Sequence, residues 1–318
     1  MKNNLPQGGM STILERLPLG SRVAVIRLRS LGDCVLTTPA ISLLKVYRPD
    51  LRIAVVVEPR FRAVFERNSD VERLLDPRLS AIFSWHPKLT LNLHGGTHSM
   101  ALTLSSGAPL RAGFWHHRYS AIYSHRIPRA QEILGEERTV HTAEHLASAM
   151  FWLGVPREEI PRAKLNPDVG KPQACATHPG RSVAVIHPFA SQVDKTWPPD
   201  RFLALADDLN QTGLEPIILA GPTDDPTPFV GRAVCNNAPL ADIISLMARA
   251  QLFIGNDSGP AHIAAAFGVP TVVLFGSSNP AIWAPWRTEA RILHRPEGIR
   301  GIGVSEVLDA IHSFKVAA

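Results

Sequence analysis

Cysteine is scarce in this chain, which contains Cys34, Cys175 and Cys235 among 318 residues. Disulfide frameworks and zinc sites use even or closely spaced sets of cysteines, and this set is odd and widely spaced. The count therefore predicts three reduced thiols, as in a cytoplasmic protein, and argues against both kinds of site.

Long apolar runs are also missing. No segment reaches the 18 consecutive apolar residues that a transmembrane helix needs. The first 20 residues lack the apolar core of a signal peptide, and we expect an extension there with a short surface helix at residues 11–17, where Thr12 and Glu15 have capping-box spacing.

Charged residues make up only 19% of the chain, and the formal net charge is +5. No run of basic residues is interleaved with aromatics, so we expect no nucleic-acid partner. The modest basic excess suits an anionic partner such as a nucleotide, a phosphorylated glycan or an acidic membrane surface.

What the chain does have is repeated alternation of apolar strands with amphipathic helices, which predicts an α/β fold with parallel sheets. Its length fits two domains. We place the first at residues 1–168, a Pro- and Gly-rich linker at 169–182 and the second domain at 183–318, with a last helix at 304–314 that could pack back on the first domain. A further helix is expected at 61–68.

The stretch at residues 252–279 is the most informative strand–helix–strand unit. Its turn holds Asp257, Ser258 and Gly259 directly before a helix. Free N–H groups at a helix start attract anions, and glycine lets a phosphate approach the backbone. An ordinary capped turn explains the same residues, and the local pattern leaves both readings open.

Asp33 follows a strand at 22–28, so it lies beyond the carboxyl end of that strand, where open α/β sheets bind ligands. The helix after it is expected to begin either at Asp33 or near Pro39. By position alone Asp33 could equally be a helix cap. His94 and His98 flank a glycine-rich stretch without an obvious third metal ligand, which favours a substrate-contacting or solvated loop.

Three motifs together resemble one family. They are RLRSLGDCVLTTPA at 27–40, HPFASQVDKTWPPDRF at 187–202 and GNDSGPAHIAAAFGVPTVVLFGSSNP at 255–280. Their order and spacing are similar to those of the ADP-heptose:lipopolysaccharide heptosyltransferases, glycosyltransferase family 9. The resemblance implies a GT-B fold, in which two doubly wound Rossmann-like domains face each other across a cleft. It also implies inverting transfer of heptose from ADP-L-glycero-D-manno-heptose to the lipid A–core oligosaccharide of lipopolysaccharide.

The resemblance also assigns roles. Asp33 matches the family's proposed general base, and Asp224 matches an acidic residue that holds the ribose. The chain has no Asp-x-Asp motif, so we expect no metal and no other cofactor. Positive charge on the leaving diphosphate is then expected from Lys195, with help from the Ser191 hydroxyl. The remaining assignments are Asp257, Ser258, Gly259 and His262 to the donor's phosphate and sugar, and Arg29, His98 and Arg111 to the acceptor.

For some of these residues the sequence also allows a purely structural role. His262 could be a buried helix histidine bonded to backbone, and Trp197 is expected to be a packing residue, as is Cys34. The expected partners are an ADP-sugar, a lipid-anchored oligosaccharide and the anionic inner face of the inner membrane, where the protein would bind from the cytoplasm without inserting. Other readings are a transferase with another nucleotide-hexose donor, a nucleotide-sugar epimerase of the same architecture, or a non-catalytic nucleotide-sugar binding protein.

Overall fold

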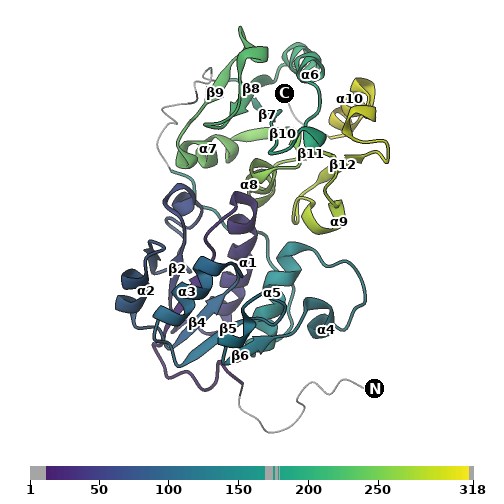
Figure 1. Cartoon of the computed structure of the whole chain (residues 1–318). Helices are drawn as coiled ribbons and strands as arrows, with labels where there is room; N and C mark the ends of the chain where they lie inside the picture. Colours follow the sequence, from purple (N-terminus) through teal and green to yellow (C-terminus); the bar gives the residue numbers. More distant parts are fainter. Residues whose placement is uncertain (1–11, 169–174, 176–177, 179, 315–318) are drawn as a thin grey trace.

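The computed structural model describes residues 12–168, 175, 178 and 180–314, which form two α/β domains placed end to end (Figure 1). Residues 1–11 of the expected extension and most of the expected linker lie outside this range. Within the described part of the chain, no helix is both long and apolar enough to span a membrane.

The first domain is built on a parallel six-stranded sheet in the order β3-β2-β1-β4-β5-β6. Its strands are β1 (Arg22–Ile26), β2 (Arg52–Val56), β3 (Arg73–Leu75), β4 (Leu89–Asn92), β5 (Leu110–Phe114) and β6 (His125–Ile127). Its helices are α1 (Leu31–Tyr47), η1 (Pro59–Val64), α2 (Leu79–Trp85), α3 (Thr97–Ser105), η2 (Ser120–Ile122), α4 (Ala130–Leu134) and α5 (Thr142–Leu153).

The second domain repeats this order on its own strands, as β12-β11-β10-β7-β8-β9, again all parallel. Its strands are β7 (Val183–His187), β8 (Glu215–Ala220), β9 (Val234–Asn236), β10 (Ala250–Asn256), β11 (Thr271–Phe275) and β12 (Ala290–His294). Its helices are η3 (Val193–Lys195), α6 (Pro199–Gln211), η4 (Thr227–Phe229), α7 (Leu240–Met247), α8 (Gly259–Phe267), α9 (Pro280–Trp283), η5 (Ile299–Gly301) and α10 (Val304–His312).

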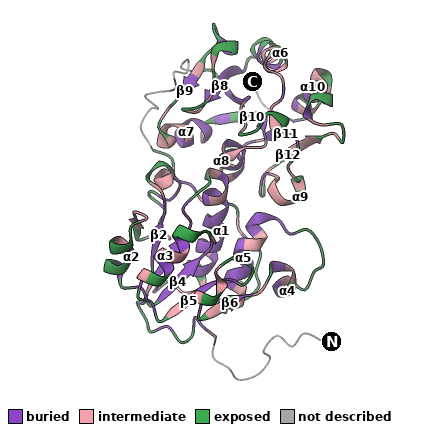
Figure 2. Ribbon diagram, in the orientation of Figure 1, coloured by how far each residue is buried: buried purple, intermediate pink, exposed green. Residues whose placement is uncertain are grey.

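Both sheets therefore have the doubly wound order, which reverses between β1 and β4 in the first domain and between β7 and β10 in the second. The central strands are apolar and buried because helices cover both faces of each sheet, as Figure 2 shows. The predicted GT-B fold is confirmed. Ligands of such sheets bind outside the carboxyl ends of the strands at the reversal points.

Helix α1 begins at Leu31 and continues through Pro39, so neither predicted start is correct. A proline inside a helix leaves the carbonyl four residues earlier without its N–H donor. Here the Thr38 hydroxyl donates to the carbonyl of Val35 at 2.8 Å and replaces that bond. The helix can therefore begin directly at the turn that carries Asp33.

Three local predictions are wrong. Residues 61–68 do not form an α-helix: a short 3₁₀ helix ends at Val64, and Arg67 has a φ of 58°, which a helix cannot accommodate. Thr12 and Glu15 do exchange the two capping hydrogen bonds, but the segment is a turn whose leucines are buried rather than a surface helix. Helix α10 packs on α6 and β11 of its own domain, where Val307 and Ile311 join the core, and not on the first domain.

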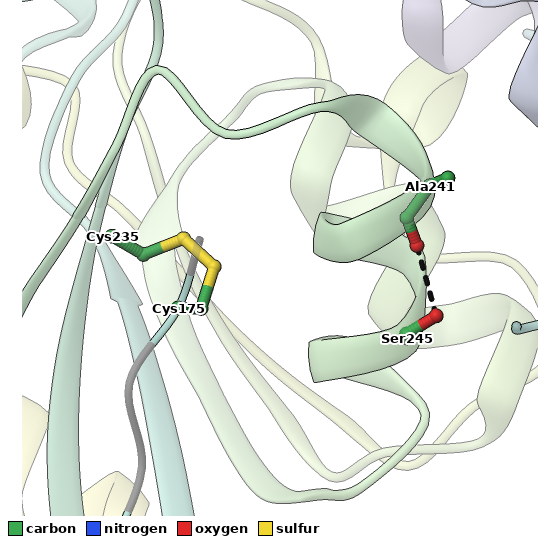
Figure 3. The surroundings of a disulfide bond; sticks show 4 residues. All are labelled: Cys175, Cys235, Ala241 and Ser245. Atoms are coloured by element: carbon green, nitrogen blue, oxygen red, sulfur yellow. Dashed lines mark hydrogen bonds between the residues drawn. A yellow bond between two sulfur atoms is a disulfide. The ribbon is translucent and has the colours of Figure 1, made fainter. Parts of the chain in front are cut away.

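The cysteine prediction is also wrong for two of the three residues. Cys175 and Cys235 form a disulfide beside α7, shown in Figure 3 next to Ser245, whose hydroxyl donates to the carbonyl of Ala241. The two cysteines are 60 residues apart in sequence, and only the fold brings the segment before β7 against β9. The number of cysteines therefore gives no support to a reducing compartment. Cys34 is free and buried, as expected of a packing residue.

Candidate active site

A cleft of about 670 Å³ lies between the two domains at the reversal points of both sheets. The first domain contributes the turn that precedes α1 and the first residues of that helix. The second domain contributes the ends of β7, β8 and β10, the start of α8, and α9. The lining residues are Ser30, Leu31, Gly32, His187, Phe189, Ala190, Ser191, Lys195, Thr223, Asp224, Asp257, Ser258, Gly259, Pro260, His262 and Trp283.

Glycines allow the first turns of α1 and α8 to meet at the base of this cleft. A Cβ at Gly32 would lie 2.6 Å from Cδ2 of His262, and a Cβ at Gly259 would lie 2.7 Å from Cδ2 of Leu31. Both distances are shorter than side chains tolerate, so these positions must lack a side chain if the helices are to be this close. The contact brings the turn that carries Asp33 next to the turn expected to bind phosphate.

The Asp33 carboxylate is held by three hydrogen bonds from its own turn and strand. Oδ2 accepts from the Ser30 hydroxyl at 3.0 Å and from its backbone N–H at 3.4 Å, and Oδ1 accepts from Nη1 of Arg27 at 3.3 Å. Asp33 thus caps α1, as one reading of the sequence expected. The side chain is 24% exposed and follows directly on three cleft-lining residues, although it is not itself among them.

The negative charge of Asp33 affects the pKa of a histidine in each domain. It raises the pKa of His262 across the cleft and that of His145 in the first domain, in each case against a larger lowering by burial. The carboxylate therefore lies near both side chains. A carboxylate has about four lone-pair sites, and the three hydrogen bonds to Asp33 leave one unused, so capping does not exclude a role as a base.

On the opposite wall, Lys195 and Asp257 lie near one another. Burial raises the pKa of the Asp257 carboxyl, while a hydrogen bond from the Ser278 hydroxyl and the charge of Lys195 act in the opposite direction. Ser258 is the N-cap of α8 and Gly259 its first residue, so their N–H groups face the cleft at the positive end of the helix.

Asp224 and Ser191 reach the cleft from loops after β8 and β7. The Asp224 carboxylate accepts the N–H of Gly221 at 2.7 Å, which closes its turn and leaves its other oxygen available. Ser191 is exposed. All seven predicted donor-side residues line this one cleft.

His262 lines the cleft and is only 4% exposed. Burial lowers its pKa to about 4, with a smaller lowering from His141. Its Nδ1 is buried and has no hydrogen-bond partner among the described residues, so the alternative of a histidine bonded to backbone is not observed at this nitrogen. Trp197, in contrast, is fully buried and donates to the carbonyl of Ile302 at 3.0 Å, which confirms it as a packing residue.

The predicted acceptor residues do not gather at the cleft. Arg111 donates to the carbonyls of Ala108 and Ile122, so its guanidinium is already engaged. Arg29 is exposed next to the Asp33 turn, and His98 is exposed in the first turn of α3 rather than in a loop. His94 and His98 belong to no group of three or more potential metal ligands within the residues described. The assignments of Arg29, His98 and Arg111 to the acceptor stay predictions.

Three residues at or near the cleft were not predicted from the sequence. Arg27 pairs with Asp33 without lining the cleft, and His187 and Trp283 line it from the end of a strand and the end of a helix. His187 directly follows an apolar run at 183–186, and a polar residue at the end of such a run is a usable signal. Nothing in the local pattern marked Trp283.

Comparison with known proteins supports the same family. The family model for glycosyltransferase family 9 (heptosyltransferase) matches residues 88–299. "Lipopolysaccharide heptosyltransferase 3" of Escherichia coli is 26% identical over 290 residues, which cover 80% of this chain and 83% of that protein.

Two solved structures show the same fold. A glycosyltransferase family 9 protein from Veillonella parvula has a TM-score of 0.82 at 21% identity, covering 92% of this chain and 96% of that one. The E. coli heptosyltransferase WaaC with ADP has a TM-score of 0.74 at 17% identity, covering 92% and 99%. With a family model matched over most of its length and a two-domain cleft at the expected motifs, this chain belongs to glycosyltransferase family 9, the heptosyltransferases, and is a transferase enzyme.

Proposed function

We propose that the protein transfers heptose from ADP-L-glycero-D-manno-heptose to the lipid A–core oligosaccharide of lipopolysaccharide, with inversion at the anomeric carbon. The observation that carries this proposal is the contact between the first turns of α1 and α8. It brings the turn that carries Asp33 in one domain beside the first turn of α8 in the other, which supports the assignment of a base and a phosphate-binding turn to the same cleft.

The second domain supplies the features that a nucleotide diphosphate requires. Lys195 and the N–H groups of Ser258 and Gly259 offer positive charge and donors to the diphosphate. Asp224 has an oxygen free for the ribose hydroxyls. The related WaaC structure contains ADP, which supports an adenine nucleotide as donor here.

The chemistry requires a base on the acceptor side and fixed positive charge on the leaving-group side. In an inverting transfer, Asp33 takes the proton of the acceptor hydroxyl as that oxygen attacks the anomeric carbon in line. The bond to the diphosphate breaks in the same step, and Lys195, the Ser191 hydroxyl and the helix start stabilise the charge that develops on it. Asp257 and His262 then lie where they can contact the heptose.

We propose that the reaction proceeds without a metal, because the sequence has no Asp-x-Asp motif to hold one. We also propose that the enzyme works at the cytoplasmic face of the inner membrane, since its acceptor is lipid-anchored and the chain is basic. Salt-sensitive binding to vesicles containing anionic phospholipid tests the second point, and absence of binding at low salt would remove it.

The deciding experiment combines binding with product analysis. Calorimetry with ADP, UDP, GDP and CDP in the presence of EDTA is expected to show binding of ADP alone. Asp33→Asn is expected to keep ADP affinity within twofold and to reduce transfer at least 100-fold, because it removes the base but keeps a capping oxygen. NMR of the product should show inversion. Preference for UDP would move the donor to another nucleotide sugar, and an active Asp33→Asn variant would exclude the base assignment.

A further inference from the structure

Four histidines gather next to Asp33, at the carboxyl edge of the first sheet, and none of them has been assigned a role above. His94 follows β4, His116 and His117 follow β5, and His145 lies in the second turn of α5. Because β1, β4 and β5 are adjacent in the sheet, the residues that follow them meet at the same edge. We call these four residues the histidine cluster.

Three rings of the histidine cluster, those of His116, His117 and His145, pack near one another and against Phe114. His145 stacks on Phe114 with centroids 4.0 Å apart and planes at 21°, and His116 lies 5.7 Å from His145 and 5.2 Å from His117. Nδ1 of His117 is 3.2 Å from the hydroxyl of Tyr123. The side chains of His94, His117 and His145 are partly exposed and His116 is exposed, so the cluster presents ring edges at the surface.

The surroundings of the cluster keep its imidazoles neutral. Burial lowers the pKa of His117 to about 3 and that of His145 to about 4, and it also lowers the pKa of His94 and His116. Positive neighbours lower these values further, and Asp33 raises those of His94 and His145. The charged groups that act on the cluster are Arg27, Arg29, Asp33 and Arg129, together with the other cluster histidines.

A metal site would be the usual reading of neutral imidazoles close together. The described residues contain no group of three or more potential ligands with suitable geometry. The rings of His116 and His117 meet at 75°, and those of His116 and His145 at 48°, so the cluster is not a parallel stack. The alternative to a metal is a ligand that contacts several of the rings at once.

We propose that the histidine cluster is the acceptor subsite of this enzyme, and that the sugar residue it takes is uncharged. The inference rests on the proposed transfer. It names the recognition element on the acceptor side and the chemical class of that sugar.

The chemistry of the groups favours a sugar without phosphate or carboxylate. Each neutral imidazole offers one donor and one acceptor, which is the combination that sugar hydroxyls match. The nearest buried cation, Arg27, is already paired with Asp33. The neutral imidazoles themselves offer no charge to an anionic substituent, which would have to bind to Arg29 or Arg129 beside the cluster instead.

The position of the cluster agrees with the chemistry. The cluster lies beside Asp33 within the first domain, whereas the donor-side residues approach Asp33 from the second domain. A sugar lying on the cluster would bring a hydroxyl to the carboxylate from the face opposite the leaving group, as an in-line displacement requires.

The test measures binding of a lipid-free core oligosaccharide ending in heptose, with its phosphates removed, by calorimetry in the presence of ADP. The double variant His117→Phe/His145→Phe keeps the rings and removes their nitrogens. It is expected to weaken oligosaccharide binding at least tenfold while changing the Kd of ADP less than twofold. His117→Gln/His145→Gln, which restores hydrogen-bonding groups, should recover part of the affinity. His294→Phe, at an exposed position on β12, serves as the matched control and should have no effect.

Proton linkage tests the class of sugar. For an uncharged sugar, the binding enthalpy at pH 6.5 should be the same in buffers of different ionisation enthalpy. Tighter binding of the untreated, phosphorylated oligosaccharide, with proton uptake abolished in the double variant, would overturn the assignment to an uncharged sugar.

The outcomes separate this inference from the proposed function. Oligosaccharide binding that the double variant leaves unchanged, or no binding by the parent protein, would overturn the subsite. Binding that depends on the cluster without any heptose transfer would support the subsite and refute the proposed reaction.

Discussion

The buried state of His262 leads to a quantitative prediction about acid stability. Its pKa lies near 4 in the folded protein, below the ordinary value of 6.5 that it regains on unfolding. Between these two pH values the unfolded chain binds a proton that the folded protein does not. Stability from the neutral imidazole is therefore fully present above pH 6.5 and is lost progressively as the pH falls toward 4.

The size of the effect follows from the same two values. Proton binding favours each state by the factor 1 + 10^(pKa − pH). At pH 5.0 this factor is about 33 for the unfolded state and about 1.1 for the folded state, so the free energy of unfolding falls by about 2 kcal/mol relative to pH 7.5. His262→Gln cannot titrate and should lack this component. Other buried histidines affect both proteins equally and cancel in the comparison.

The assay is urea unfolding followed by tryptophan fluorescence at pH 7.5 and 5.0 for the parent, His262→Gln and the exposed control His294→Gln. The parent and the control should lose about 2 kcal/mol more than His262→Gln between the two pH values. Any destabilisation by the glutamine itself is present at both pH values and does not affect the difference. An equal loss in all three proteins would show that His262 is not buried and neutral in the way described.

Three other experiments test separate parts of the molecule. Lys195→Ala should lower turnover about 100-fold or more, since losing one contact to the developing charge costs about 3–4 kcal/mol; near-parental turnover in an ADP-release assay would discard that role. Gly259→Ala should lower the free energy of unfolding by about 1–3 kcal/mol, because its Cβ would meet Leu31 at 2.7 Å. Combining it with Leu31→Gly, which removes the Cβ, Cγ and Cδ2 atoms that the new Cβ would meet at 2.7–2.8 Å, should make the two losses less than additive, and additive destabilisation would contradict the contact. Thiol titration of the unreduced, denatured protein should find Cys34 alone, with the other two cysteines reacting only after reduction.

Much of the fold could be predicted because buried parallel strands appear in the sequence as continuous apolar runs. Strand β11 is the second strand of the unit predicted at 252–279, and it runs from Thr271 to Phe275 between Pro270 and Gly276. The start of α1 was missed because a proline normally ends or begins a helix, and the compensating hydroxyl of Thr38 is not a recognised signal. The partner of α10 could not be predicted, as an apolar helix face does not specify which domain it covers.

The candidate site was predictable on the donor side and much less so on the acceptor side. Lys195, Asp224 and Asp257 each follow the end of a strand within a short motif. The position of each residue at the sheet edge could therefore be predicted from its own motif. The histidine cluster draws on residues after two strands and on a helix, and His117 and His145 are 28 residues apart in sequence. Only the strand order brings them together. Arg111 shows why a basic residue near a strand is weak evidence for a ligand contact, because nearby carbonyls already accept hydrogen bonds from its guanidinium.

The two domains approach each other where the backbone of a glycine in one domain meets a side chain of the other, Gly32 against His262 and Gly259 against Leu31. Each sheet reverses at the strand that precedes a helix of the cleft, β1 before α1 and β10 before α8. Those two helices meet at glycines, so the separation between the Asp33 turn and the Ser258 turn is limited by the contacts of Gly32 with His262 and of Gly259 with Leu31. A change in the angle between the domains must therefore move the Asp33 carboxylate relative to the first turn of α8. If the proposed transfer is correct, its geometry depends on this contact, and larger residues at Gly32 or Gly259 should lower activity as well as stability.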